Sequence, residues 1–115
     1  MKRIVTPGTL PTADLHQYLL GAVAPRPIAF VSTIDAEGRV NLAPYSFFNA
    51  FSSNPPILVF SSNRRVENNT TKDTLHNIME SRECVVNVVS CPIVHQMMVC
   101  SVDFPNDISE FVQTG

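Results

Sequence analysis

The chain has 115 residues, of which 44% are hydrophobic and 16% charged, and its formal net charge is −2. This length fits one domain over residues 1–115 and excludes two independent cores. The small net charge excludes a general attraction to nucleic acid or to an acidic membrane, whereas the low charged fraction predicts that a partner subunit or a ligand covers part of the surface.

The cysteines and the amino terminus are typical of a cytoplasmic protein. Cys84, Cys91 and Cys100 are odd in number, form no CxxC pair and lie in apolar segments, so we expect buried, reduced thiols rather than disulfides or zinc ligands. The first residues lack the long apolar stretch of a secretory signal. No apolar run approaches the ~20 residues of a membrane span.

The first predicted elements are a helix and a strand. Thr12 can cap a short helix that runs to residue 20, and Gly21 can end it in the left-handed conformation. The sequence PRP at residues 25–27 then enforces extended backbone. The β-branched and aromatic run over residues 28–34 predicts a strand.

A β-hairpin is predicted next. Residues 35–39 have the length and the glycine of a hairpin loop, so residues 39–44 should return antiparallel, with Leu42 on one face and Asn41 on the other. Pro44 cannot donate a ladder hydrogen bond. We therefore expect the returning strand to be interrupted there, at an edge or at a bulge, with backbone groups left free.

The rest of the chain alternates between strand and helix patterns. In order, the predicted elements are an extended segment at 46–53, a turn at 54–56, a buried strand at 57–62, a helix that begins at 72–74 and carries Leu75, Ile78 and Met79 inward, an apolar strand at 83–90, a helix at 90–100 and a short helix from Asp107. Hairpin-linked strands with helices in the connections predict a mainly β protein, a small antiparallel barrel rather than a parallel α/β sheet.

Two polar segments have the composition of a phosphate site. Residues 61–65 (SSNRR) follow a strand end, and residues 70–74 (TTKDT) stand at a helix start. A phosphate group needs hydroxyl and amide donors, cations and preferably a helix amino terminus, and these segments contain all of them. The other interpretation is a solvated loop whose Thr or Asp caps the helix.

The uncharged stretch NLAPYSFFNA at residues 41–50 has the composition of a site for a planar ring. A strand broken at Pro44 would expose carbonyls and amides. The segment adds polar side chains and aromatic rings, namely Asn41, Ser46, Asn49, Tyr45, Phe47 and Phe48. Sites for heteroaromatic ligands are mostly apolar with a few placed polar groups. The alternative is an ordinary core in which these rings pack together.

Other chemistries lack their motifs. His16, His76 and His95 lie far apart and show no metal-ligand spacing, so we expect no metal site. No GxSxG, GxGxxG or P-loop pattern occurs, and we assign no catalytic side chain. Two adjacent arginines also lack the interleaved basic and aromatic residues of a nucleic-acid site.

Four blocks occur in an order and at spacings that resemble a known family. They are PRPIAFVST (25–33), NLAPYSFFNAFSSNPPILVFSSNRR (41–65), KDTLHNI (72–78) and ECVVNVVS (83–90). Together they resemble the flavin reductase-like proteins of the FMN-binding split-barrel superfamily, including the flavoredoxin-type members. The resemblance implies a split β-barrel, a homodimer and one FMN per subunit near the dimer interface.

The resemblance also implies which residues bind FMN. The stretch from 43 to 47 would lie along the isoalloxazine ring, and the segments FSSNRR and KDT would hold the phosphate and ribityl chain. The expected cofactor-binding residues are Arg26, Asn41, Ala43, Pro44, Tyr45, Ser46, Phe47, Asn49, Ser61, Arg64, Lys72, Asp73 and Thr74.

The function implied is that of an FMN-binding oxidoreductase. It would take hydride from NADH or NADPH at flavin N5 and reduce free flavin, ferric complexes or a partner monooxygenase. Because the flavin carries the chemistry, such an enzyme needs no catalytic triad. The alternatives are an electron-carrier flavoprotein without nicotinamide turnover and a non-catalytic remnant. Family members usually continue for several strands beyond the point that matches Phe111, so the chain resembles the front part of a longer domain.

Overall fold

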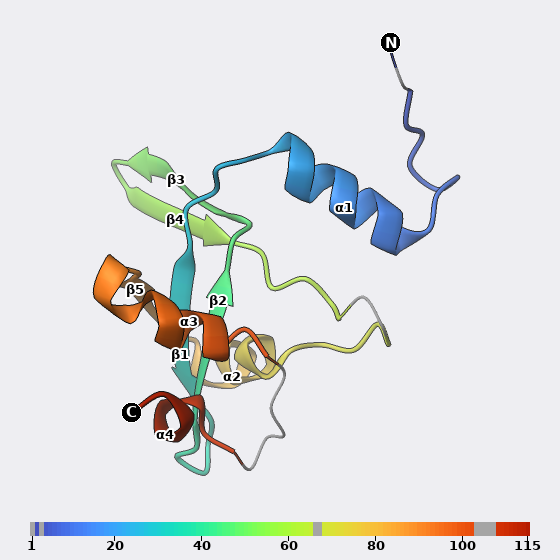
Figure 1. Ribbon diagram of the computed structural model, residues 1–115. Coiled ribbons are helices and arrows are strands. Elements are labelled where there is room, and N and C mark those ends of the chain that lie inside the picture. The colour runs from blue at the N-terminus through green and yellow to red at the C-terminus, as the bar shows by residue number, and fades with distance from the viewer. Residues whose placement is uncertain (1, 3, 66–67, 103–107) are drawn as a thin grey trace.

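The computed structural model describes residues 2, 4–65, 68–102 and 108–115. Its elements, in chain order, are α1 (Thr12–Ala22), β1 (Ala29–Ile34), β2 (Val40–Tyr45), β3 (Phe48–Ser53), β4 (Pro56–Phe60), α2 (Asp73–Ser81), β5 (Val85–Val88), the 3₁₀ turn η1 (Cys91–Ile93), α3 (Val94–Val99) and α4 (Glu110–Thr114) (Figure 1). In these ranges no helix is long and apolar enough to cross a membrane.

The strands form two antiparallel sheets. β1 lies between β2 and β5 in a three-stranded sheet, and β3 pairs with β4 in a separate hairpin. β1 is the most buried strand because it is central and carries small or β-branched residues such as Ala29 and Val31. The prediction of a mainly β, antiparallel fold is confirmed, although the strands of the described residues do not close into a barrel.

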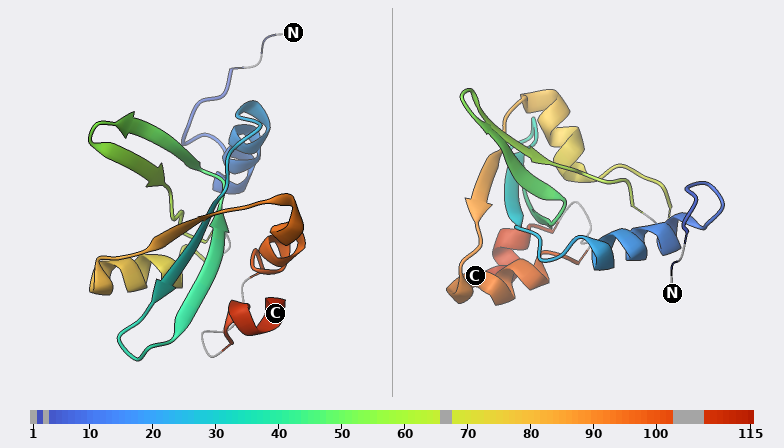
Figure 2. Two further views of the ribbon diagram at one scale, coloured as in Figure 1. Left: turned by 90° about the vertical axis from the view of Figure 1, so that its left-hand side faces the viewer. Right: turned by 90° about the horizontal axis from the view of Figure 1, so that it is seen from above.

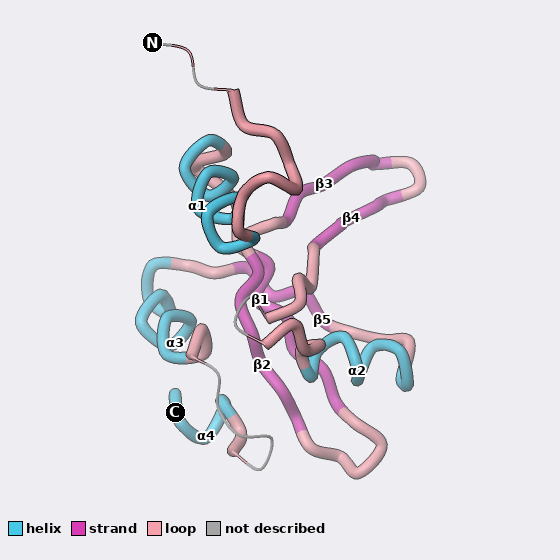
Figure 3. The backbone as a smooth tube through the Cα atoms, turned by 90° about the vertical axis from the view of Figure 1, so that its right-hand side faces the viewer, coloured by secondary structure: helices cyan, strands magenta, loops and turns pink. Residues whose placement is uncertain are grey.

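Helices cover both faces of the three-stranded sheet. α2 lies on one face, and α3 and α4 lie on the other (Figures 2 and 3). On the α3 face, Phe30 and Leu42 pack with Met97 and Cys100, whereas the opposite face carries a second cluster of Ala29, Val31 and Tyr45. Residues of β2 therefore alternate between two small cores, as the hairpin pattern predicted.

The ends of α1 differ from the prediction. Thr12 lies inside the helix after Pro11 and makes no capping bond, and the helix continues past Gly21 to Ala22. The guanidinium of Arg26 donates hydrogen bonds to the carbonyls of Leu20 and Val23. A side chain from the next segment therefore satisfies the last carbonyls, and no left-handed glycine is needed.

We expected Pro44 to interrupt β2, but the strand is not broken there. Pro44 stays paired in register with Phe30, and the strand ends one residue later at Tyr45. The proline is tolerated because β2 is an edge strand of its sheet. The chain then bends at residues 46–47 and enters β3, so the change of sheet lies just beyond the proline.

Several segments predicted to be buried are exposed. Residues 57–59 of β4 are exposed, Val88 of β5 is 85% exposed, and Met79 of α2 is 73% exposed. The buried side chains of α2 are instead Thr74 and Asn77, which face polar groups of the sheet. The apolar side chains of these segments are exposed because no other described residues cover them.

The prediction of free thiols is confirmed for all three cysteines, whereas the prediction of burial is correct for Cys100 and wrong for Cys84 and Cys91. Cys100 is buried in the α3 core, where desolvation raises the pKa of its thiol. Cys84 and Cys91 are exposed because they flank the edge strand β5. All three are free thiols.

The carboxyl-terminal helices are shorter than predicted. The segment from 90 to 100 divides into η1 and α3, with Met97 and Cys100 buried on one face as expected. The predicted helix start at Asp107 lies outside the described residues. The last helix, α4, is described from Glu110.

Candidate functional site

A cavity of about 570 Å³ opens where β2 passes into β3. The amide of Ser61, just after β4, donates to the carbonyl of Phe47 at 2.8 Å, which brings the end of the hairpin to the bend between the two sheets. The cavity is lined by His16, Leu20, Arg26, Pro44, Tyr45, Ser46, Phe47, Ser61, Asn63, Arg64, Arg65 and Lys72. The segment predicted to contact a planar ring and the segments predicted to contact a phosphate therefore line the same cavity.

Arg26 and His16 form the wall next to α1. The Arg26 Nε donates to Ser46 Oγ at 3.3 Å, and the guanidinium lies 5.8 Å from the centroid of the Phe47 ring. The ring of His16 meets the edge of Phe47 at a centroid distance of 5.7 Å. These contacts tie the helix to the bend at Ser46 and Phe47.

Cationic side chains also line the cavity. Lys72 Nζ lies 5.3 Å from the centroid of the Tyr45 ring, and Arg64 Nε donates to the carbonyl of Asn69 at 2.7 Å. Arg65 is held by Asp73, with an Nη2–Oδ2 distance of 3.5 Å. Lys72, Arg64 and Arg65 thus line the same cavity as Pro44 and the aromatic rings of Tyr45 and Phe47.

Tyr45 separates the cavity from the core. It is 5% exposed, and its hydroxyl and that of Ser62 are buried without a hydrogen bond among the described residues. Burial raises the pKa of the Tyr45 phenol, and the nearby hydroxyls of Thr74 and Ser62 offset part of that rise. The phenol is therefore a neutral part of the wall at physiological pH.

A second, smaller pocket of about 60 Å³ adjoins the first. It shares Pro44, Tyr45, Arg65 and Lys72 with the large cavity. Its other lining residues are Asn41, Ala43, Asp73, Thr74, Cys100, Ser101, Val102 and Glu110. The start of α2 lies between the two pockets.

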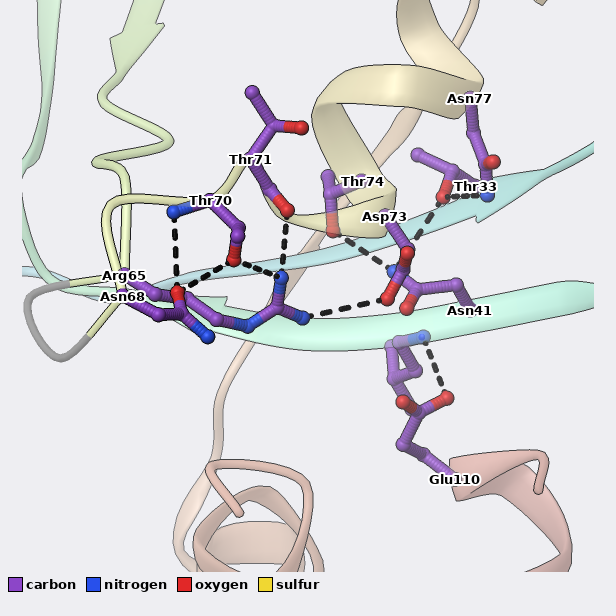
Figure 4. A network of polar contacts seen from close by, with 11 residues as sticks. Thr33, Asn41, Arg65, Asn68, Thr70, Thr71, Asp73, Thr74, Asn77 and Glu110 are labelled. Atoms are coloured by element: carbon purple, nitrogen blue, oxygen red, sulfur yellow. Dashed lines mark hydrogen bonds and ion pairs between the residues drawn. The ribbon is translucent and has the colours of Figure 1, made fainter. Parts of the chain in front are cut away.

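Polar contacts hold the start of α2 against the sheet (Figure 4). Asn41 Nδ2 donates to Thr74 Oγ1 at 2.8 Å, and Asn77 Nδ2 donates to Thr33 Oγ1 at 3.0 Å. At the free edge of β2, a Glu110 carboxylate oxygen accepts from the backbone amide of Leu42 at 3.1 Å. The strand that precedes the bend at residues 46–47 is therefore held from one face and from its free edge.

The structure brings together twelve of the thirteen predicted site residues. Eight of them line the large cavity, namely Arg26, Pro44, Tyr45, Ser46, Phe47, Ser61, Arg64 and Lys72. The other four line the small pocket, namely Asn41, Ala43, Asp73 and Thr74. Asn49 lines neither pocket. It is exposed on β3, where its side-chain oxygen accepts from the amide of Ala50 at 2.8 Å.

Four lining residues were not among the predicted set: His16, Leu20, Asn63 and Arg65. His16 and Leu20 belong to α1, which reaches the cavity only through the tertiary contacts of Arg26 and Phe47. Asn63 and Arg65 lie in the same SSNRR segment as Ser61 and Arg64. The polar composition of that segment predicts a phosphate site over residues 61–65 as a whole, so these two residues lie inside the predicted segment.

The chain is similar to known proteins over most of its length. An uncharacterized protein of Aquifex aeolicus is 43% identical over 101 residues, which are 88% of this chain and 51% of that protein. The structure of nitrilotriacetate monooxygenase component B from Bacillus cereus is 32% identical with a TM-score of 0.89, over 99% of this chain and 55% of the other. The chain thus spans about half the length of the curated relatives it matches.

A more distant structure supports the fold alone. A protein with a split barrel domain from Shewanella frigidimarina is 23% identical with a TM-score of 0.74, over 90% of this chain and 50% of the other. The family model described as "Flavin reductase like domain" matches residues 20–115. With this match over most of its length, the chain belongs to the flavin reductase-like domain family.

Proposed function

We propose that this chain binds FMN in the 570 Å³ cavity and acts as an NAD(P)H-dependent oxidoreductase. The observation that carries the proposal is one cavity lined both by aromatic rings, those of Tyr45 and Phe47, and by cations, among them Arg64 and Lys72. FMN has the same division, with a planar apolar ring at one end and a phosphate dianion at the other.

The ring end of FMN fits the β2–β3 bend. The cavity volume lies inside the range of about 300–1,000 Å³ that small-molecule sites occupy. Ser46 and Phe47 stand at the bend, outside the regular strands, and of their backbone carbonyls that of Phe47 already accepts from the Ser61 amide. A flat heteroaromatic ring can lie against this wall and hydrogen bond to main-chain groups.

The phosphate end fits the start of α2. Lys72 directly precedes the helix, and among the described residues no side chain caps its first turn. Free amides and the positive end of the helix dipole attract an anion. Arg64 and Ser61 line the same cavity and add a cation and a hydroxyl.

Bound FMN would supply the acceptance and release of electrons, and the protein would supply placement and shielding. Arg26 and Ser46 would fix one side of the ring site through their shared hydrogen bond. A neighbouring hollow of about 540 Å³ is lined by residues of α1 and by Asn69. It shares His16, Phe47, Asn63, Arg64 and Arg65 with the main cavity. It offers room for a nicotinamide donor beside the flavin.

We also propose that the chain functions as a homodimer. Exposed apolar side chains on the β3–β4 hairpin support this proposal, including Phe51 at 69% and Leu58 at 56% exposure. A partner subunit would remove that surface from water. A partner protein as electron acceptor and a cytoplasmic location stay predictions from the sequence.

Substitution of Lys72 tests the FMN proposal. Lys72→Gln or Arg64→Gln should weaken FMN binding by about ten- to a hundredfold, because each loses a charge-assisted hydrogen bond of about 1.5–3 kcal/mol to the phosphate. Riboflavin, which has no phosphate, should bind each variant nearly as well as it binds the wild type. Flavin fluorescence titration measures both affinities, with Arg39→Gln on the distant hairpin loop as the control.

Equal weakening for FMN and riboflavin would place the phosphate elsewhere. Oxidation of NADH or NADPH by the FMN-loaded protein separates the enzyme from a carrier. A protein that binds FMN without oxidising either nucleotide is a carrier, and a protein that binds no flavin contradicts the whole proposal.

A further inference from the structure

Arg65 joins the end of the hairpin to both neighbours of Lys72. Its Nη1 donates to the carbonyl of Thr71 at 2.6 Å and to Thr70 Oγ1 at 3.3 Å, and its Nη2 pairs with Asp73 at 3.5 Å. Its backbone amide donates to the carbonyl of Thr70 at 2.9 Å. One guanidinium thus contacts the residues just before and just after Lys72 (Figure 4).

These contacts restrict where Lys72 can place its ammonium group. A planar guanidinium with several directed bonds fixes geometry better than an isolated ion pair does. Lys72 lies over the Tyr45 ring and lines both pockets. Its backbone is also the N-cap of α2, so a shift of the Thr71 carbonyl or of Asp73 would move the cation and the helix start together.

The same turn is fixed from the sheet side by a buried contact. Thr74 is 1% exposed, and its hydroxyl accepts from Asn41 Nδ2 at 2.8 Å. The Thr74 hydroxyl therefore lies in the protein interior. Asp73 turns toward Arg65, and as an anion it would repel a phosphate placed beside it.

We infer that Arg65 and Asp73 are positioning residues that hold Lys72 and the first turn of α2 in place for the phosphate of FMN, and so set the preference for FMN over riboflavin. This inference rests on the proposed function. The charge of Asp73 alone predicts the opposite effect, because an acidic side chain next to a phosphate site weakens anion binding. Asp73 can favour the phosphate only by positioning a cation.

The sign of the effect of Asp73→Asn tests the inference. If Asp73 positions Lys72, the variant should bind FMN about three- to tenfold more weakly, a part of the loss expected for Lys72→Gln. Riboflavin affinity should change by less than about twofold, because the ring wall is untouched. If Asp73 only contributes its charge, FMN should bind more tightly, and that result overturns the inference.

A double variant separates positioning from direct contact. In Asp73→Asn/Lys72→Gln, the loss of FMN affinity should match that of Lys72→Gln alone to within about twofold, since the group being positioned is already gone. Losses that multiply would show that Asp73 acts independently of Lys72. Asp35→Asn is the matched control, because it removes another Arg–carboxylate pair, at 2.6 Å on the distant hairpin loop, and should leave FMN affinity unchanged.

If urea unfolding shows that Asp73→Asn does not fold, Arg65→Lys tests the inference instead. Lysine keeps the charge, but its single ammonium group cannot contact both Thr71 and Asp73 as the planar guanidinium does. The variant should therefore bind FMN more weakly than the wild type does and bind riboflavin as well as the wild type does. Unchanged FMN binding by this variant overturns the inference. If the wild type itself does not distinguish FMN from riboflavin, or Lys72→Gln has no effect, the proposed function fails first and this inference fails with it.

Discussion

Tyr45 shows how one side chain can serve both the core and the site. Its ring packs against Phe60, with centroids 5.1 Å apart, while Lys72 lies over it from the cavity. Its hydroxyl is buried without a hydrogen bond among the described residues. The ring therefore provides the packing, and the hydroxyl adds little to stability.

Tyr45→Phe should change the free energy of unfolding near neutral pH by less than about 1 kcal/mol, since the hydroxyl removed has no well-made partner. The folded-state pKa of this phenol lies above that of the unfolded chain. The wild type should thus be fully stabilised below the usual tyrosine pKa of roughly 10 and lose stability as the pH rises through the folded value.

Urea unfolding at about pH 8 and about pH 11, on either side of that usual pKa, measures the difference. Tyr45→Phe should lose less stability than the wild type at the higher pH, and Tyr18→Phe on α1 serves as the matched control. An equal loss in the wild type and in Tyr45→Phe would show that this phenol does not ionise as described.

The site residues differ in how far the sequence could predict them. Lys72 and Ser46 lie in segments whose composition indicates a ligand, and both line the cavity. Arg65 lies in the predicted phosphate segment but was not assigned as a cofactor-binding residue, because its role depends on contacts with Asp73 and Thr71 that only the fold defines. Polar residues near a site either touch a ligand or orient others, and spacing along the chain does not separate these roles.

At the scale of elements, the β3–β4 hairpin is the least covered part of the structure. Ile57, Leu58 and Val59 are consecutive, so they alternate between both faces of β4, and each is more than 40% exposed. A two-stranded hairpin is at best marginally stable alone in water. The apolar run predicts a strand, which is confirmed, but the prediction that this strand is buried is wrong among the described residues.

Leu58→Lys should therefore reduce self-association. Loss of a buried leucine costs about 1.5–3 kcal/mol, which would raise the dimer dissociation constant by about ten- to a hundredfold. Sedimentation velocity over a range of protein concentrations measures the shift, and Thr12→Lys on exposed α1 is the control. A wild type that stays monomeric at every concentration contradicts the proposed dimer.

At the scale of the whole molecule, segments far apart in the sequence meet around one cavity. The helix α1, the bend at 46–47, the end of β4 and the start of α2 all contribute walls. Sequence blocks could predict which segments belong to the site, because their composition is local. They could not predict that β2 would pass straight through Pro44, since that depends on its place at the sheet edge.

The most direct test of the central claim is an amide NMR titration of the chain with FMN. The account predicts that FMN shifts two groups of amides together, those of residues 45–47 and those of residues 72–74, while riboflavin shifts only the first group. Shifts centred instead on a separate hollow that Val85 and Phe111 line, or identical shifts for the two flavins, would contradict it.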